Sequence, residues 1–425
     1  MDFLGTGLRD RSLRESSSDP IHSVDSVVED LSLRERSSLI LLDRTLHEHW
    51  SLGQNVMLNW TPCPGGIRVL IVPHYALAGY ASDGADGDGR PPESFLQTLL
   101  SGRRQLEPTQ LDKVARLMST EPTVLSLPNP AIDARTQDIV ERMIKRYSIS
   151  YAPNRAVALF DIVGFSLLNP IEQMLQINSL SHSLNSAQSK LSSKKLDVDF
   201  ARTTTGDGFY VWNRDLTLDA NINLFHLMHL ALADNAIARS KAKGNAAPRL
   251  RACFHIGGCY EFQQPEGLTP TIYSYIVGDV TVELARMIDR SLPDQIMVGD
   301  FRAEMPFLDR EAPGWVTLDS IDFVARATHH VALLRGLTLS GDKVEFIRCY
   351  LTGAKLSDGE FSIRRILVRD KHGRVRTVYN SKANIYRRNG APLLLGIEDG
   401  SLDAKTNMSL ECEHIVRAPI VRITS

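Results

Sequence analysis

The chain has 425 residues, 43% of them hydrophobic, which is enough for about two or three domains that each bury a core. Its 48 basic and 50 acidic residues nearly cancel, so no overall field would recruit nucleic acid or a membrane surface. The five cysteines are scattered without metal-ligand spacing, which is typical of reduced thiols. Without an apolar run of about 18 residues or a signal-peptide core, we expect a soluble, cytoplasmic protein.

The first third of the chain shows no motif that points to a chemistry. Residues 1–35 are rich in Ser, Arg and Asp, and we predict a flexible tail there. Residues 36–150 have a globular composition and no readable role, and "YASDGADGDGRPPES" interrupts them as a predicted mobile loop. The acids in this loop lack the spacing and the closing Glu of a calcium loop. Residues 132–147, "IDARTQDIVERMIKRY", have the apolar spacing of a helix.

From about residue 155 the pattern changes to strands that alternate with long helices. The runs "AVALFDIVGF", "FYVW", "RACFHIGG" and "TIYSYIV" are typical of strands, and residues 218–244 predict an amphipathic helix that Gly244 ends. This alternation indicates an α/β or α+β layered fold. Residues 340–425 predict a small β-rich domain, in which 362–380 form two strands around a His-Gly turn.

Two aspartates stand at the ends of predicted strands. Asp161 ends an apolar run and is followed by Gly164, whereas Asp207 lies between Gly206 and Gly208 in a turn that leads into a strand. If the two strands pair, the carboxylates meet at one place that suits a cation and a polyphosphate. Taken alone, Asp161 is also consistent with a helix cap and Asp207 with an ordinary Asp-Gly turn.

A third segment, "YIVGDVTVELARMID", ends a strand at Gly278 and then carries Val282 and Arg286 four positions apart on one helix face. Together with "FDIVGFS", "GDGFYV" and "LRACFHIGG", it resembles the catalytic domain of the class III nucleotidyl cyclases over about residues 155–305. The resemblance implies an α+β fold with a ferredoxin-type sheet, and a catalytic domain over 151–335. It also implies metal-dependent cyclisation of a nucleoside triphosphate with release of pyrophosphate.

The resemblance carries specific roles onto this chain. It implies two Mn²⁺ or Mg²⁺ ions held by Asp161, Ile162 and Asp207, a transition-state arginine at Arg286, and substrate contacts at Gly164 and Phe165. Because the arginine of this family comes from the other subunit, it also implies a head-to-tail homodimer with composite active sites.

Three positions depart from the family pattern. The two positions that select a purine base are Thr203 and Tyr275 here, and Val282 replaces the transition-state Asn. A Tyr ring would fill space that a purine needs, so we expect a pyrimidine substrate, UTP in preference to CTP. At this level the chain resembles the bacterial pyrimidine cyclases of anti-phage signalling, whose cyclic product reaches a downstream effector. The 340–425 region resembles, more weakly, their sensor domains. The alternatives are an adenylate or guanylate cyclase and a catalytically weak, cyclase-like nucleotide-binding module.

Two further clusters favour structural roles. His226 and His229 lie among apolar residues of the long predicted helix without an acidic third ligand, which favours packed histidines over a metal site. His255 is expected to help build its strand. The basic segment 368–388 is interpreted as a solvated strand face, with a polyanion site as the less favoured alternative.

Overall fold

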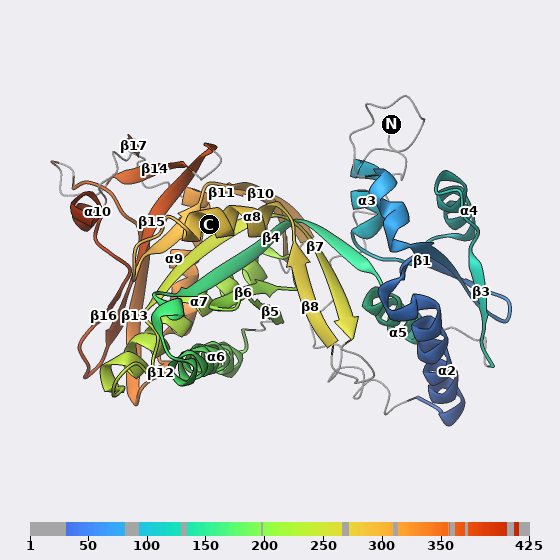
Figure 1. Cartoon of the computed structure of the whole chain (residues 1–425), viewed down its shortest axis with the longest axis horizontal. Helices are drawn as coiled ribbons and strands as arrows, with labels where there is room; N and C mark the ends of the chain where they lie inside the picture. The colour runs from blue at the N-terminus through green and yellow to red at the C-terminus, as the bar shows by residue number, and fades with distance from the viewer. Residues whose placement is uncertain are drawn as a thin grey trace. The chain divides into compact units, whose positions relative to one another are not determined.

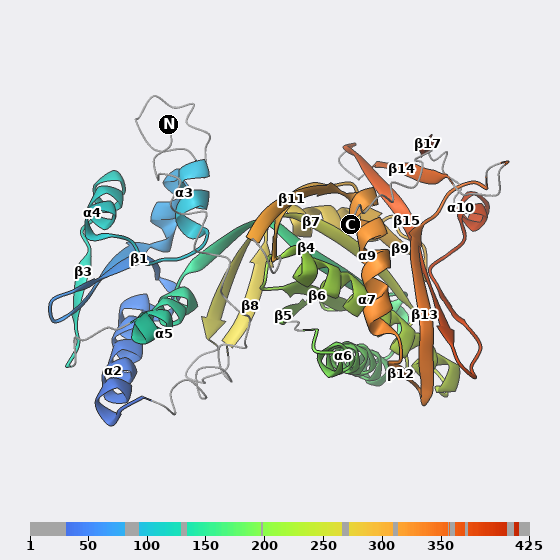
Figure 2. The same cartoon turned by 180° about the vertical axis from the view of Figure 1, so that it is seen from behind.

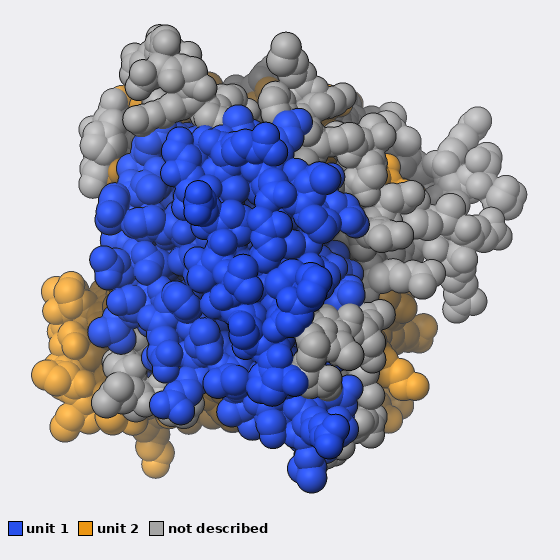
Figure 3. Space-filling model, turned by 90° about the vertical axis from the view of Figure 1, so that its right-hand side faces the viewer, with its two compact units in different colours: residues 1–152, 259–277 blue, residues 153–258, 278–425 orange. Residues whose placement is uncertain are grey.

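The computed structural model describes residues 31–80, 93–128, 134–196, 199–265, 272–308, 313–355, 357, 362–369, 373–405 and 412–415. It divides the chain into two compact units, shown in different colours in Figure 3. Unit 1 contains residues 1–152 and 259–277, and unit 2 contains residues 153–258 and 278–425. The predicted α+β class is confirmed. Within the part of the chain that the structure describes, no helix is long and apolar enough to cross a membrane.

Unit 1 combines a three-stranded antiparallel sheet, in the order β1-β2-β3, with four helices among its described residues. Its elements are α2 (Leu33–Trp50), β1 (Asn55–Cys63), β2 (Gly66–Pro73), α3 (Glu93–Leu100), α4 (Pro108–Leu117), β3 (Thr123–Ser126), α5 (Ala134–Arg146) and β8 (Ile272–Val277). The predicted helix at 132–147 is confirmed by α5. Trp60 on β1 is fully buried against α2 and α5, so this sheet has its own core.

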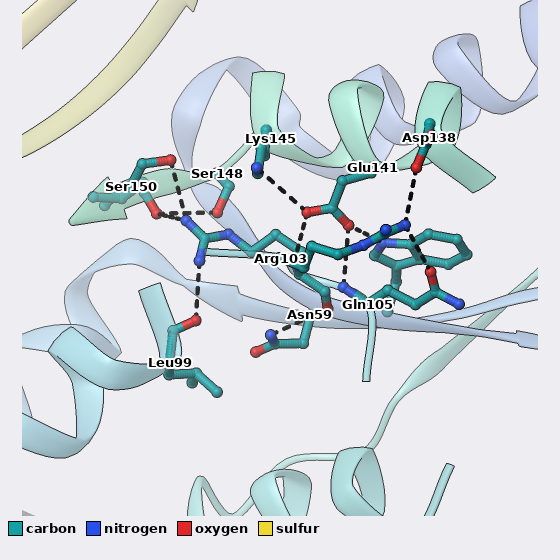
Figure 4. A network of polar contacts seen from close by, with 12 residues as sticks. Asn59, Leu99, Arg103, Gln105, Asp138, Glu141, Lys145, Ser148 and Ser150 are labelled. Carbon is teal, nitrogen blue, oxygen red and sulfur yellow. Dashed lines mark hydrogen bonds and ion pairs between the residues drawn. The ribbon is translucent and has the colours of Figure 1, made fainter. Parts of the chain in front are cut away.

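A buried carboxylate joins the helix α5 to the strand β1. Glu141 accepts hydrogen bonds from Trp60 Nε1 at 2.9 Å and from the backbone N–H groups of Arg104 and Gln105 at 2.5 and 3.1 Å (Figure 4). The Arg104 guanidinium, also buried, donates to the carbonyls of Leu99 and Ile149. All of these partners lie within unit 1, so this network stabilises that unit itself.

Unit 2 holds most of the segments that resemble the cyclases, whereas residues 275–277, which begin the third segment, belong to unit 1. Its elements are β4 (Ile149–Ile162), α6 (Pro170–Ser193), β5 (Phe200–Thr204), β6 (Gly208–Asn213), α7 (Leu218–Lys241), β7 (Leu250–Pro265), α8 (Asp279–Ile288), β9 (Ile296–Gly299), β10 (Arg302–Leu308), β11 (Pro313–Asp319), α9 (Ser320–His330), β12 (Thr338–Leu339), β13 (Asp342–Leu351), β14 (Ile363–Arg369), β15 (Val375–Arg387), β16 (Leu393–Leu395), α10 (Asp399–Lys405) and β17 (Cys412–Ile415). The strands β4 and β7 each continue into unit 1. Figures 1 and 2 show these elements from opposite sides.

The chain order β4-α6-β5-β6-α7-β7 folds into a sheet in the order β7-β4-β6-β5. This is the βαββαβ, ferredoxin-like arrangement that the resemblance implies. The apolar side chains of α6 and α7 pack with Ala158 and Phe160 of β4 and with Phe254 of β7 in one buried cluster. Both helices therefore cover the same face of the sheet, and side chains that alternate with these residues point to the other face.

The C-terminal strands continue the same sheet. Strand β15 pairs antiparallel with β9, β9 pairs parallel with β7, and β13 pairs with β15. Leu339, Val344 and Ile347 belong to the same buried cluster as the helices α6 and α7. The expected boundary between 151–335 and 340–425 thus does not coincide with the boundary of a compact unit, because residues on both sides share one sheet and one core.

Several local predictions can be compared directly with the structure. The predicted hairpin of 362–380 is confirmed by the antiparallel pair β14 and β15. The long helix α7 ends at Lys241, three residues before the left-handed Gly244, and Ala242 is already extended. The predicted tail 1–35 falls largely outside the described residues, as do the aspartates of the predicted mobile loop.

Candidate active site

The face of the sheet opposite α6 and α7 carries the candidate site. On β4, Ala158 and Phe160 face the helices, so the alternation of the strand turns Asp161 to the other side. On β6, the neighbour of β4, the Tyr210 hydroxyl donates to the backbone carbonyl of Thr281 in α8 at 3.1 Å. Helix α8 therefore lies against this face, beside the end of β4.

The two predicted carboxylates are brought together by strand pairing. Asp161 lies opposite Gly208, and the Ile162 N–H donates to the Asp207 carbonyl at 3.0 Å. The turn before β6 contains Gly206 at a φ of 98°, a left-handed conformation that favours glycine. A Cβ atom on Gly208 would lie 1.9 Å from the Phe160 carbonyl oxygen. One glycine thus provides the turn and the other permits the close approach that sets Asp207 beside Asp161.

Arg251 on β7 is a site residue that the sequence analysis did not single out. Its Nε donates to Asp161 Oδ2 at 2.6 Å, and its Nη1 donates to the Ser291 carbonyl at 3.1 Å. Burial raises the pKa of the Asp161 carboxyl, Arg251 counteracts this rise, and the charges of Asp207 and Asp289 add to it. A signal was present in the sequence: Arg251 stands in "RACFHIGG", although the partner strand cannot be read from that run.

Helix α8 supplies the two remaining predicted positions. The Arg286 guanidinium lies 3.9 Å from the Asp289 carboxylate, whose charge contributes to the raised pKa of Asp161. Val282, one turn before Arg286, exposes 48% of its surface although it is apolar. This helix therefore presents the cationic Arg286 and the exposed, apolar Val282. Val282 has no polar side-chain atom that could contact a phosphate.

The predicted base-contact residues lie in different units. Thr203 on β5 pairs with Tyr210 and so lies on the α8 face of unit 2. Tyr275 lies on β8 in unit 1, where its ring stacks on Phe262 with centroids 5.4 Å apart and an interplanar angle of 16°. Tyr275 is 38% exposed, so its ring does not point into a core.

Gly164 and Phe165 follow the end of β4. Gly164 has a φ of 72° and turns the chain after the strand. Phe165 lines a groove of about 460 Å³ together with Met174 and Ile177 of α6 and Phe209 of β6. This groove lies on the α6 side of the sheet, so the Phe165 side chain is on the other side from the Asp161 carboxylate.

The donor chemistry fits a divalent cation of the Mg²⁺ or Mn²⁺ type. Asp161 and Asp207, whose charge acts on the Asp161 carboxyl, offer two carboxylates, and Ile162 can contribute only its backbone carbonyl oxygen. Among the described residues, no three His, Cys, Asp or Glu side chains are placed to hold a metal. Two carboxylates are nevertheless what Mg²⁺ commonly takes from a protein when substrate phosphates complete its shell.

The histidines of α7 are core residues, as the sequence analysis favours. His226 and His229 are each 2% exposed, and His229 Nδ1 lies 2.8 Å from the Phe225 carbonyl oxygen. Burial lowers the pKa of His226 to about 3 and that of His229 to about 4. His255 on β7 is also buried, which lowers its pKa to about 4. All three imidazoles are therefore neutral at pH 7.

No protein-family model matches the chain, and no curated protein sequence matches it. Among solved structures, the guanylate cyclase domain of RhGC from Catenaria anguillulae in complex with GTP matches at a TM-score of 0.32 and 11% identity, over 56% of this chain and 100% of that one. The adenylyl cyclase CyaB from P. aeruginosa matches at a TM-score of 0.28 and 12% identity, over 57% and 97%. The guanylyl cyclase Cya2 matches at 0.26 and 14%, over 40% and 91%. At TM-scores this far below 0.5, these matches determine neither substrate nor mechanism.

Proposed function

We propose that residues 151–335 form a metal-dependent nucleotidyl cyclase domain. The observation that carries the proposal is the pairing of β4 with β6, which brings the backbone of Asp207 to the end of β4, beside Asp161. The Asp161 carboxyl turns to the face covered by α8, and the charge of Asp207 acts on it. The reaction forms a bond between the ribose 3′ oxygen and the α-phosphorus of a nucleoside triphosphate. The bond from that phosphorus to the bridging oxygen breaks, and pyrophosphate leaves.

Each residue has a distinct task in this proposal. Asp161, Asp207 and the Ile162 carbonyl hold Mn²⁺ or Mg²⁺, which lowers the pKa of the 3′ hydroxyl and neutralises the phosphates. Arg286, which is permanently charged and planar, donates to the oxygens of the transferred phosphoryl group as charge builds on them. The carboxylates and the guanidinium act in one site only if they converge, and a homodimer with composite sites brings Arg286 to the partner's carboxylates.

We further propose a pyrimidine substrate, UTP in preference to CTP. The proposal rests on Thr203 and Tyr275, and it is supported by the exposed ring of Tyr275, which stacks on Phe262 rather than packing into a core. A flat aromatic pair at the surface offers area against which a single-ring base can lie. We place the cyclic product in bacterial anti-phage signalling, where a separate effector binds it, in line with the sequence resemblance.

Pyrophosphate release from each of the four ribonucleoside triphosphates with Mn²⁺ tests the activity. Asp161→Ala and Asp207→Ala should abolish release while the circular dichroism spectrum stays native. Asp219→Ala, at the exposed start of α7, removes the same charge and should retain full release. Release that persists in either site variant would contradict the proposal.

Competition among the four triphosphates at equal concentration, with the product identified by mass, tests the base. A cyclic pyrimidine should dominate, and Tyr275→Ala should lose this preference. Tyr273→Ala removes a similarly exposed ring two residues away on β8 and should keep it. A cyclic purine as the main product would indicate an adenylate or guanylate cyclase instead.

Mixing an Asp161→Ala chain with an Arg286→Ala chain tests the composite site. In a heterodimer one of the two sites contains all the required groups, so part of the activity should return. If subunit exchange is demonstrated and the mixture is as inactive in pyrophosphate release as each variant alone, both groups act within one chain.

The alternative function is a cyclase-like module that binds a nucleotide without turning it over. The exposed Val282 favours it, because one missing transition-state donor lowers turnover by about 10²–10³. Calorimetric binding of a triphosphate without pyrophosphate release would support the module. Val282→Asn should then gain release, whereas in an active cyclase it should raise an existing rate.

A further inference from the structure

One carboxylate of the candidate site is paired with a cation that belongs to the chain itself. Asp161, Asp207 and Asp289 lie near enough to one another for the latter two to act on the Asp161 carboxyl. The Asp161 side chain is only 11% exposed, and its Oδ2 accepts the Arg251 Nε–H at 2.6 Å. The Asp161 carboxylate is largely buried, so the ion pair with Arg251 offsets the cost of keeping its charge there.

We infer that Arg251 occupies, in the metal-free chain, the place on Asp161 that a second divalent cation takes. This inference rests on the proposed function, since it presupposes that Asp161 and Asp207 bind metal. A carboxylate that bridges two ions uses both of its oxygens, whereas Oδ2 of Asp161 is already bound to Arg251. A guanidinium and a divalent ion compete for that oxygen, because two cations held against the same atom repel each other.

The surroundings of Arg251 permit this exchange. Its side chain is 26% exposed, more than that of Asp161, so the guanidinium can turn toward solvent while the carboxylate stays in place. Its second bond is to a neutral acceptor, the carbonyl of Ser291 just after α8, which water can replace. Arg251 is thus a positioning residue that yields to the metal rather than a metal ligand.

Arg249 gives a matched control two residues earlier. It pairs with a different carboxylate, Asp294, through its Nε at 2.8 Å, and it is more exposed than Arg251. Its backbone carbonyl accepts from the Val163 N–H, so it lies close to the end of β4. Arg249→Ala therefore removes one positive charge near the site without touching Asp161.

Titration with Mn²⁺ in the absence of nucleotide, followed by the electron paramagnetic resonance signal of the free ion, tests the inference. Arg251→Ala and Arg251→Gln should bind Mn²⁺ about tenfold more tightly than the wild type, which is the size of effect that loss of a competing charge-assisted hydrogen bond gives. Arg249→Ala should change the affinity less than about twofold, because its charge is not bound to a site carboxylate. Unchanged or weaker binding in both Arg251 variants would overturn the inference and make Arg251 an orienting group.

A second measurement does not depend on whether a variant folds. In the wild type, the Arg251 Nε–H resonance in ¹⁵N-resolved spectra should shift and lose protection from exchange as diamagnetic Mg²⁺ is added. A resonance that stays unchanged while Mg²⁺ binds would refute the exchange. If neither the wild type nor the variants bind Mn²⁺ or Mg²⁺, and no pyrophosphate is released, the metal site of the proposed function is wrong as well. If the ions bind and their affinity does not depend on Arg251, only the inference about Arg251 is wrong.

Discussion

Acid should destabilise unit 2 through the buried histidines of α7. His226 and His229 have pKa values of about 3 and about 4 in the folded chain, well below the ordinary value of 6.5. The unfolded chain therefore binds more protons between these values and pH 6.5. Stability is fully present above about pH 6.5 and is lost as the pH falls below it. The charges that act on His226 come from His229 on its own helix and from His330 on α9.

The size of the effect follows from the width of this window. At about pH 5 each unfolded imidazole is protonated and each folded one is still neutral, which lowers the free energy of unfolding by about 2 kcal/mol per histidine. The two histidines together should lower the free energy of unfolding by about 4 kcal/mol between about pH 7.5 and 5. Asp161 acts in the opposite direction, because its folded pKa is raised, but it is present in every variant compared below.

Urea unfolding at the two pH values, followed by circular dichroism, measures this contribution. Between the two pH values, the free energy of unfolding of a His226→Leu, His229→Leu double variant should fall by about 4 kcal/mol less than that of the wild type. For each single variant the difference should be about half as large. His182→Leu, on the exposed side of α6, should keep the wild-type sensitivity. An equal loss of stability in wild type and double variant would refute the assignment of neutral buried imidazoles.

Three further changes have expected outcomes that unfolding or activity assays can check. Glu141→Ala should lower the free energy of unfolding by about 3–5 kcal/mol, because it leaves buried donors unpaired. Asp138→Ala, on the same helix but in an exposed pair with Arg103, should cost about 1 kcal/mol or less; equal losses would contradict the network in Figure 4. Gly208→Ala should disrupt the β4–β6 pair and abolish pyrophosphate release, whereas Gly206→Ala, with open space around its Cβ, should cost about 1 kcal/mol and retain partial release. Asn380→Ala should lower the free energy of unfolding of unit 2 by about 2 kcal/mol, since Asn380 joins Gln295, Thr352 and Ile397 through buried hydrogen bonds; a change within error would show that these bonds add nothing.

The sequence predicts the parts of the site that depend on local pattern. The apolar run that ends at Asp161 and the glycines around Asp207 indicate a strand end and a turn, and the structure pairs them as expected. Arg251 could not be assigned in this way, because its contact with Asp161 depends on which strand lies beside β7. Pairing between distant strands is set by the whole core, and a single run of residues does not encode it.

The same reason explains the difference in domain organisation. Residues 340–425 have the composition of a separate β-rich region, yet β15 pairs with β9, almost 80 positions earlier in the chain. Residues 259–277 follow a strand of unit 2 in sequence but belong to unit 1. Neither association leaves a periodic signal, whereas the amphipathic pattern of α5 predicts its bounds within a few residues.

The pairing of β15 with β9 has a consequence for the solubility of shortened chains. All four residues of β9 are buried, and three of them are Ile296, Met297 and Val298. A chain that stopped near residue 335 would leave this strand at the edge of the sheet with unpaired N–H and C=O groups. Such an apolar edge is a template for pairing with the same edge of another molecule. The C-terminal strands therefore protect this edge of the sheet from self-association, whatever else they bind.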